Sequence, residues 1–263
     1  MSGVLRVERT GPVARVTLAR PEVRNAFNAE LIAELRAAFD SLATKPPEAL
    51  RAIVLAGDGE VFCAGADVEW QRASIHLSME ENEADAGRLQ EMLIAIDECP
   101  VPVIAAVQGA ALGGGMALCC VADITLATAE ASFGFTEVKL GLMPAVISPF
   151  VMARIGEGNA RGLFPTGERF GSERALRIGL VSEVVADREA LDARVETVLG
   201  EVLSAGPEAA RNAKSVIRAQ RGLARGDALA LTVERAARQR VSAEGQEGLG
   251  AFLDKRRPSW REE

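Results

Sequence analysis

The stretch Gln108-Gly109-Ala110-Ala111-Leu112-Gly113-Gly114-Gly115-Met116-Ala117 places three consecutive glycines between two apolar runs. The run 102–107 predicts a buried strand, and the run 112–121 predicts a helix. A strand, a glycine turn and a helix start expose backbone N–H groups at the positive end of a helix dipole. A tight turn is the alternative, but it explains one glycine more easily than three. We therefore expect a site that stabilises an oxyanion.

The same stretch matches neither of two common phosphate-binding motifs. Leu118 stands where G-x-G-x-x-G requires its third glycine. No Gly-Lys-Ser or Gly-Lys-Thr is present to make it a P-loop. The glycines therefore indicate a backbone anion site without either nucleotide-binding signature.

The composition of the chain excludes several kinds of chemistry. Its 263 residues include one histidine, His76, no tyrosine and four cysteines, and the formal net charge is −7 at pH 7. A multi-histidine metal site is excluded, and a Ser-His-Asp hydrolase would depend on His76 alone. The acidic balance disfavours nucleic acid and anionic membranes as partners. The cysteines form no C-x-x-C pair and no apolar run is long enough to span a membrane, so we expect a soluble cytoplasmic protein without a metal.

Strand and helix patterns alternate over the first two thirds of the chain. Two alternating runs around Thr10-Gly11-Pro12 predict a hairpin. Asn28 begins a helical pattern that Pro46-Pro47 must end, and Ser78 with Glu81 forms a capping box at the start of another helix. Further strands are predicted at 50–55, 102–107 and 123–127. The pattern favours an α/β fold.

Beyond Asp187 the turn-rich pattern ends and the sequence becomes helical. Long segments rich in Ala, Leu, Arg and Glu predict helices at 188–204, 207–221, 226–242 and 244–257. We expect residues 1–200 to form the core and residues 201–263 to form a C-terminal helical region.

Two further stretches carry residues suited to a site. Phe62-Cys63-Ala64-Gly65-Ala66-Asp67 follows a predicted strand, and Asp67 is predicted to cap a short helix; a plain strand-to-helix turn explains this stretch equally well. Phe133-Gly134-Phe135-Thr136-Glu137 sets one carboxylate among apolar residues, an arrangement that raises a carboxyl pKa. The alternative for Glu137 is a solvated position on a turn.

In this order, the three stretches resemble the enoyl-CoA hydratase/isomerase (crotonase) family, and within it the 3-methylglutaconyl-CoA hydratase branch. The resemblance runs from Arg20-Pro21-Glu22-x-x-Asn25-Ala26 to Gly245-x-Glu247-Gly248-x-x-Ala251-Phe252-x-x-Lys255-Arg256 and covers nearly the whole chain. It implies a spiral of ββα units followed by an all-helical trimerisation module. It also implies a homotrimer or a dimer of trimers that acts on an acyl-CoA thioester, with no cofactor besides the coenzyme A of the substrate.

The resemblance assigns the reacting groups. It implies that the backbone N–H groups of Ala66 and Gly114 bind the thioester oxygen and that Glu137 is the acid/base. Family hydratases carry a second glutamate, and this chain has Ala117 at that position. Glu137 then either activates water and returns its proton on the same face, or moves a proton between carbons as an isomerase does.

The resemblance also assigns positions around the substrate. Those for coenzyme A are Arg24, Ala26, Ala64, Asp67 and Val68, with Phe252 and Lys255 reaching a neighbour's coenzyme. Those for the acyl group are Trp70, His76, Ala117, Val146 and Ser148. Core packing is the alternative for Trp70, a loop position without catalytic function for His76, a helix start for Ser148 and an ordinary charged helix end for Lys255. The stretches 136–142 and 144–151 carry the likeness to the methylglutaconyl branch.

These observations favour a lyase that reversibly hydrates a branched 2-enoyl-CoA, such as 3-methylglutaconyl-CoA, to 3-hydroxy-3-methylglutaryl-CoA. The alternative enzyme is a double-bond isomerase that uses the same Glu137. A hypothesis from another class is RNA binding, which the net charge of −7 disfavours. A catalytically silent acyl-CoA-binding scaffold is a further alternative, because of Ala117.

Overall fold

The computed structural model describes residues 3–261 and is built on a six-stranded sheet with the order β1-β2-β3-β4-β6-β9. Its strands are β1 (Leu5–Thr10), β2 (Val13–Leu18), β3 (Ala52–Gly57), β4 (Val103–Val107), β6 (Ile124–Thr128) and β9 (Glu183–Val185). The first two strands form the predicted antiparallel hairpin, and all other neighbouring strands are parallel. Strands β3 and β4 are buried along their whole length, as expected for parallel strands covered on both faces.

A second, three-stranded sheet consists of β5 (Ala110–Leu112), β7 (Ser132–Gly134) and β8 (Arg169–Gly171). Strand β5 follows β4 directly and leads into helix α4 (Gly114–Val121), and β7 follows β6 in the same way before helix α5 (Ser148–Leu163). The chain therefore repeats a unit of two strands, one in each sheet, and a helix. This repeat places the start of α4 at the junction of the two sheets.

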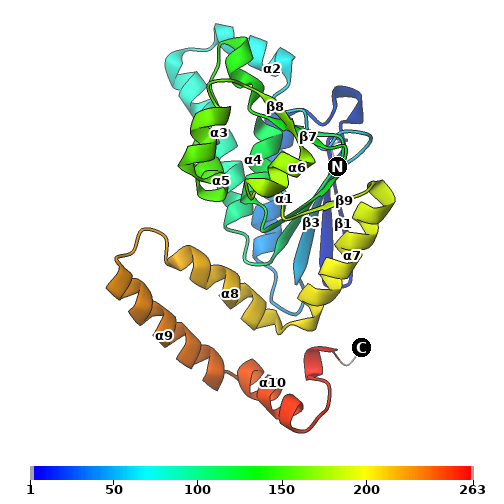
Figure 1. Ribbon diagram of the computed structural model, residues 1–263, viewed down its shortest axis with the longest axis vertical. Coiled ribbons are helices and arrows are strands. Elements are labelled where there is room, and N and C mark those ends of the chain that lie inside the picture. Colours follow the sequence, from blue (N-terminus) through cyan, green and yellow to red (C-terminus); the bar gives the residue numbers. More distant parts are fainter. Residues whose placement is uncertain (1–2, 262–263) are drawn as a thin grey trace.

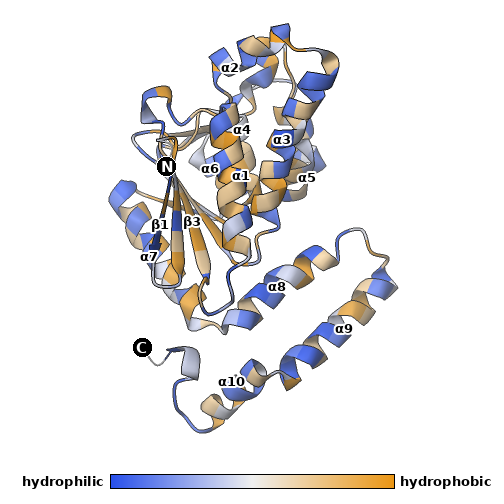
Figure 2. Ribbon diagram, turned by 180° about the vertical axis from the view of Figure 1, so that it is seen from behind, coloured by the Kyte–Doolittle hydropathy of each residue, from blue (hydrophilic) through white to orange (hydrophobic). Residues whose placement is uncertain are grey.

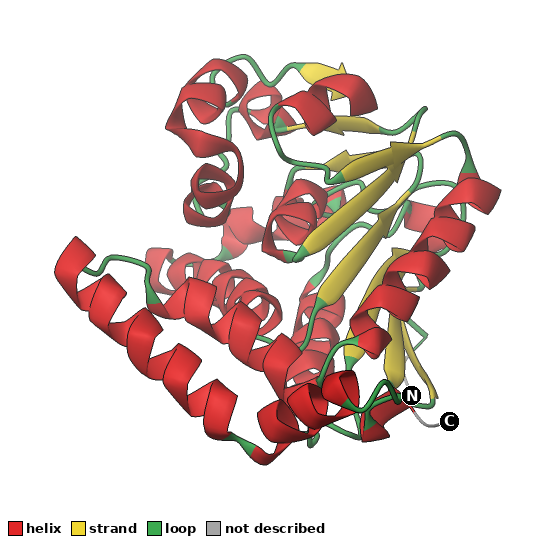
Figure 3. Cartoon of the chain, turned by 60° about the horizontal axis from the view of Figure 1, so that its bottom comes forward, coloured by secondary structure: helices red, strands yellow, loops and turns green. Residues whose placement is uncertain are grey.

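The two faces of the main sheet are covered by different helices (Figures 1 and 3). Helices α1 (Ala29–Ala43), α3 (Met79–Asp97), α4 and α5 cover one face, and α7 (Arg188–Ser204) covers the other. Strand β3 shows how the sequence divides between them: Ile53 and Leu55 pack with the first group, and Val54 packs with α7. This alternation is the two-residue period of a strand.

Helices α8 (Pro207–Ala219), α9 (Arg225–Val241) and α10 (Ala243–Leu253) extend away from the sheets as an arm (Figure 1). Helices α8 and α9 contain no buried residue, and α10 buries only Ala251. Figure 2 shows apolar and polar residues together along this arm. Short helical segments complete the chain: Pro21–Val23, α2 (Val68–Ala73), Ser74–His76, Thr136–Leu140, α6 (Ser172–Arg177) and Ser259–Arg261.

Several predicted boundaries are wrong by a few residues. The strand expected at 50–55 spans Ala52–Gly57, because its register pairs Ala52 with Val13 and Gly57 with Leu18 of β2. The last helix, expected to reach 257, ends at Leu253, and Lys255 adopts a left-handed conformation with φ 53°. Within the described part of the chain, no helix has the length and apolar character needed to cross a membrane.

Candidate active site

Each of the three consecutive glycines lies where a side chain would collide with another segment. A Cβ atom at Gly113, Gly114 or Gly115 would lie 2.9 Å from Glu137 Oε1, 2.7 Å from Phe27 Cε2 or 2.4 Å from the Cys63 carbonyl oxygen, respectively. Gly113 also has φ 49°, a conformation that disfavours other residues. The glycine run therefore allows the start of α4 to touch three segments that are distant in sequence.

Gly114 is the first residue of α4, so its N–H has no partner within the helix. Among residues 3–261, no backbone carbonyl outside the helices and strands accepts from it. All seven residues that follow Gly114 in α4 are buried, so the helix packs into the core directly after this N–H. The Gly114 N–H is thus a free donor at the positive end of a helix dipole.

Ala66 supplies a second free donor through its pairing with Phe27. The Phe27 N–H donates to the Gly65 carbonyl over 2.7 Å, and the Asp67 N–H donates to the Phe27 carbonyl over 2.8 Å. In this parallel pattern the flanking residues make both bonds, so the N–H and carbonyl of Ala66 itself point to the other side. A Cβ at Gly65 would lie 3.6 Å from the Gly114 nitrogen, so the two donor segments are adjacent.

Phe27 links the two donors. Its backbone pairs with the segment around Ala66, and its ring lies against the Cα of Gly114. The ring is 1% exposed, so it is fixed in the core. One buried residue therefore contacts both halves of the donor pair.

Glu137 lies beside this pair on the turn Thr136–Leu140. One carboxylate oxygen faces Gly113, and the other, Oε2, is buried without a hydrogen-bond partner within the described residues. Burial raises the pKa of Glu137, and its own backbone N–H opposes part of that change. A buried carboxylate oxygen without a partner is costly, which marks Glu137 as a functional candidate.

The other residues predicted to line the acyl group differ in how deeply they are buried. Ala117 is fully buried in α4, one turn beyond the glycines, and Trp70 is half-buried against the main core. Val146 is half-buried, whereas His76 is exposed. Ser148 begins α5, and its hydroxyl donates to the Ala145 carbonyl over 2.8 Å, as a helix-start residue would.

The predicted coenzyme segments lie side by side. The Ala64 N–H donates to the Arg24 carbonyl over 3.0 Å, and the Arg24 side chain is exposed beside it. Val68 is exposed, whereas Ala26 is buried. Asp67 caps α2 by accepting from the Glu69 N–H over 3.0 Å, as predicted.

Phe252 and Lys255 lie elsewhere in the chain. Phe252, on α10, is 82% exposed, and α10 packs against α8 and α9 at the opposite end of the molecule from α2 and α4 (Figure 1). The structure therefore does not bring these two residues to the site of their own chain.

Arg20 and Asn25 have structural connections that the sequence did not reveal. Asn25 is fully buried with φ 55°, and its amide donates to the carbonyls of Asp58 and Val61 over 2.8 Å each. Arg20 donates to Asp67 Oδ2 over 3.1 Å. The only sequence signal is an asparagine at a turn, a residue that tolerates the left-handed region.

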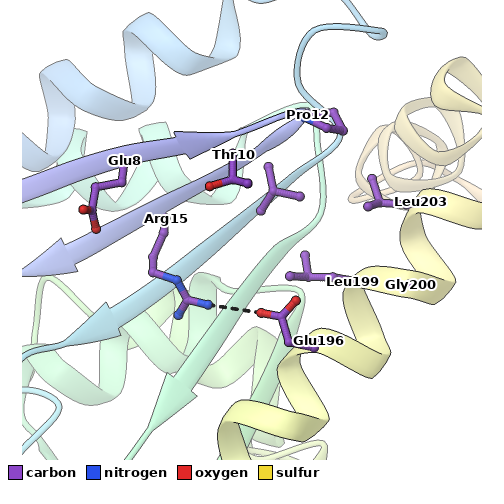
Figure 4. Close-up of a pocket in the computed structure, with 9 residues that line it drawn as sticks. Glu8, Thr10, Pro12, Arg15, Glu196, Leu199, Gly200 and Leu203 are labelled. Carbon is purple, nitrogen blue, oxygen red and sulfur yellow. Dashed lines mark hydrogen bonds and ion pairs between the residues drawn. The ribbon is translucent and has the colours of Figure 1, made fainter. Parts of the chain in front are cut away.

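A separate hollow of about 580 Å³ lies between the β1–β2 hairpin and α7 (Figure 4). Leu199 and Val13 line it, and Arg15 forms an ion pair with Glu196 over 3.4 Å at its edge. Because α7 covers the other face of the sheet from α4, this hollow is separate from Glu137. No group of three or more His, Cys, Asp or Glu side chains that could hold a metal occurs within residues 3–261.

Two unpaired backbone donors next to a half-buried carboxylate define a class of site. Such donors can bind an oxygen that gains negative charge, and a carboxylate of raised pKa can take up and return a proton nearby. The arrangement is that of an enzyme that polarises a carbonyl group and moves a proton beside it.

Comparison with known proteins agrees with an enzyme of this kind, which polarises a carbonyl group and moves a proton beside it. The family model for enoyl-CoA hydratase/isomerase matches residues 8–263. The crotonyl-CoA hydratase of Syntrophomonas wolfei is 33% identical over 260 residues, covering 97% of this chain and 96% of that protein. The chain therefore belongs to the enoyl-CoA hydratase/isomerase family of enzymes.

Solved structures confirm the expected crotonase fold. An enoyl-CoA hydratase from Shewanella pealeana superposes with a TM-score of 0.92 at 38% identity, covering 98% of this chain and 96% of that one. AtuE of Pseudomonas aeruginosa superposes with a TM-score of 0.94 at 36% identity, covering 98% of this chain and 99% of that one.

Proposed function

We propose that this chain catalyses the reversible addition of water to a 2-enoyl-CoA. The observation that carries the proposal is the position of the Glu137 carboxylate against Gly113, one residue before the free N–H of Gly114. The family and the name of the Syntrophomonas relative support an enoyl-CoA as substrate. Residues 1–200 would bind the acyl-CoA, and residues 201–263 would serve oligomerisation.

The chemistry follows from the charge that develops on the thioester. Glu137 takes a proton from water as the water oxygen bonds to C3, and the electron pair of the double bond moves to the thioester oxygen. The N–H groups of Ala66 and Gly114 donate to this oxygen, and loss of one such donor typically costs ~10²–10³ in rate. The enolate then returns the electrons, and C2 takes the proton from Glu137. Water is thus added across C2 and C3 with no net change at Glu137.

One carboxylate is sufficient in this scheme because it acts twice. Ala117 carries no group that can bind water, since it is a fully buried methyl side chain. The unpartnered Oε2 atom of Glu137 leaves the carboxylate free to orient the water itself. Both the water oxygen and the proton then arrive on the face of the substrate nearest Glu137.

For the substrate we propose a branched enoyl-CoA of the 3-methylglutaconyl-CoA type. Support comes from the stretches 136–142 and 144–151, which carry the likeness to that branch. Val146 is half-buried just before α5, where it can line the acyl group.

Incubation with a panel of straight and branched enoyl-CoAs in H₂¹⁸O tests the reaction and the substrate together. Hydration places ¹⁸O in the product, and we expect the fastest labelling with 3-methylglutaconyl-CoA. A moved double bond without label would instead support an isomerase. That alternative is favoured by one observation, the Ala117 position, because proton transfer between carbons needs only one carboxylate.

We also propose that the chain assembles as a homotrimer or a dimer of trimers. Large apolar side chains of the arm are more than half exposed in the single chain: Ile217, Leu229, Val233, Val241, Phe252 and Leu253. In such an assembly Phe252 and Lys255 would reach a neighbour's coenzyme A, since they do not reach the site of their own chain. The mass in solution, measured by light scattering, tests this.

We place the activity in the cytoplasm, without a metal and without a cofactor besides the coenzyme A of the substrate. The four cysteines are buried thiols, which suits a reducing compartment. Activity that survives a chelator and needs no added cofactor would agree with this proposal.

A further inference from the structure

Arg20 lies two residues after the end of β2 and contacts both segments that pair at the oxyanion site. Its guanidinium donates to the Ala26 carbonyl over 2.5 Å and to Asp67 Oδ2 over 3.1 Å. Ala26 precedes Phe27, and Asp67 follows Ala66. Arg20 therefore joins the two segments at the ends of the Phe27–Ala66 pairing.

The backbone of Arg20 is itself fixed by a buried residue. Its N–H donates to Asn25 Oδ1 over 2.9 Å, and its carbonyl accepts from the Asn25 N–H over 2.8 Å. Asn25 is fully buried and anchored to the turn after β3 through Asp58 and Val61. The guanidinium thus projects from a rigid base, which limits how far Asp67 can move.

We propose that Arg20 is a positioning residue that holds the Ala66 N–H at the thioester oxygen by way of Asp67 and Ala26. This inference rests on the proposed function of the same site. The Ala66 segment is held by two backbone bonds to Phe27 and by the bond from the Ala64 N–H to the Arg24 carbonyl, and the ion pair adds a side-chain restraint at Asp67. A donor works only within about 2.7–3.1 Å of the oxyanion, and a displacement of ~1 Å can cost ~10²-fold in rate.

The burial of Arg20 separates this role from binding of coenzyme A. Its side chain is 14% exposed and that of Asp67 is 16% exposed, and the guanidinium already has two protein partners. Arg24, four residues later, has an exposed side chain and is the better cation for a phosphate. Loss of Arg20 should therefore lower kcat and leave coenzyme A affinity unchanged.

The test uses the full chain with Arg20→Gln, Asp67→Asn and both together. Asn is a good helix cap, so Asp67→Asn keeps the start of α2 and removes only the charge partner. Arg6→Gln is the matched control, because it removes a bidentate pair with Asp58, at 2.8 and 2.9 Å, from the same edge of the sheet. The probe is a dimethylaminocinnamoyl-CoA, whose absorption moves to longer wavelength when its carbonyl is polarised.

We expect Arg20→Gln to lose at least half of the wavelength shift and ~10–10² in kcat, with the dissociation constant of free coenzyme A unchanged. Asp67→Asn should lose a similar part of the wavelength shift and of kcat, and the double variant should be no worse in either than the single variants. Arg20→Lys keeps the charge but can reach only one partner, so it should be intermediate. Arg6→Gln should retain the full shift and kcat.

An unchanged shift and kcat in Arg20→Gln would overturn the inference, as would equal losses in Arg6→Gln. Additive losses in the double variant would also overturn it, because they would show that Arg20 does not act through Asp67. The wild-type chain could polarise the probe and yet hydrate no enoyl-CoA, which would contradict the proposed hydration. Loss of the wavelength shift in Arg20→Gln would in that case still support the positioning role of Arg20.

Discussion

The core and the arm of this molecule bury their apolar residues in different ways. In the core, β3 and β4 are buried throughout, and helices on both faces of the sheet supply the covering side chains. In the arm, α8 and α9 bury nothing, although α9 carries Leu229 and Val233 at 59% and 71% exposure. The core therefore has its packing partners within one chain, whereas the arm lacks them.

Polar contacts attach the arm to the core. Lys214 of α8 pairs with Asp123 over 2.7 Å, and Arg211 donates to the Leu50 carbonyl over 3.0 Å. Glu244 of α10 accepts from the N–H groups of Glu208 and Ala209 and so caps α8 from a distance. These contacts fix the direction of the arm, and the Lys214–Asp123 pair is largely buried, with side chains 12% and 30% exposed. This difference is the basis of our proposal that the core carries the chemistry and that the arm serves contact between chains.

The largest expected effect concerns Glu137 in the core. Glu137→Gln should lower kcat by ~10²–10⁴-fold, because the unpartnered carboxylate beside Gly113 can no longer move a proton. Circular dichroism and the mass in solution should be unchanged, since Gln has the same shape. Full activity of Glu137→Gln on the best substrate would contradict the assignment of Glu137 as the acid/base of the core.

The raised pKa of Glu137 also predicts how the stability of Glu137→Gln differs from that of wild type as pH changes. Between the ordinary carboxyl pKa of 4.5 and the raised pKa of Glu137, the folded chain holds a proton that the unfolded chain has lost. The free energy of unfolding therefore falls as pH rises through this range. Gln does not titrate, so Glu137→Gln should be more stable than wild type at pH 7, and the difference should shrink as pH falls toward 4.5. A less stable variant at pH 7 would contradict the burial of this charge.

Gly114→Ala should have the next largest effect. Its Cβ would meet the Phe27 ring at 2.7 Å, so the ring or the donor must move, and we expect a loss of ~10–10³ in kcat. Overpacking should also cost about 1–3 kcal/mol of stability. Gly200→Ala on α7 is the control: nothing lies within 4 Å of its added methyl, so stability should rise slightly with activity intact.

The sequence predicted the parts of the core whose patterns are local. The capping box at Ser78, the Asn28 cap and the hairpin are all confirmed. It could not predict the Arg20–Asp67 pair, which spans 47 positions, because nothing in either segment specifies its partner. For the arm, apolar spacing predicts helices but not what covers them.

Val233→Glu tests the arm in isolation from the site. A valine buried at a contact between chains contributes about 1.5–3 kcal/mol, and a buried unpaired carboxylate would cost more. We expect the assembly to dissociate, measured by light scattering, while the circular dichroism of the core stays the same. Arg235→Glu, on an exposed part of the same helix, should leave the assembly intact. An unchanged mass in Val233→Glu would show that this face of α9 contacts no other chain.

The smallest expected effect concerns Lys255. If the arm reaches a neighbour's coenzyme A, Lys255→Gln should raise KM about fivefold, the ~1 kcal/mol typical of an exposed ion pair, with kcat unchanged. This rise should shrink at high salt. Arg225→Gln, an exposed cation at the other end of the arm, should leave KM unchanged. Equal KM values for Lys255→Gln and wild type would show that Lys255 does not contact a neighbour's coenzyme A, and the arm would then serve assembly alone.

The stereochemistry of water addition in D₂O tests most directly whether one carboxylate performs both proton transfers. The deuterium at C2 and the new oxygen at C3 can be placed on the same or opposite faces by NMR of the product. Because Glu137 would make both proton transfers, the account predicts addition to the same face. Addition to opposite faces would contradict it, since the proton would then come from a second group across the substrate.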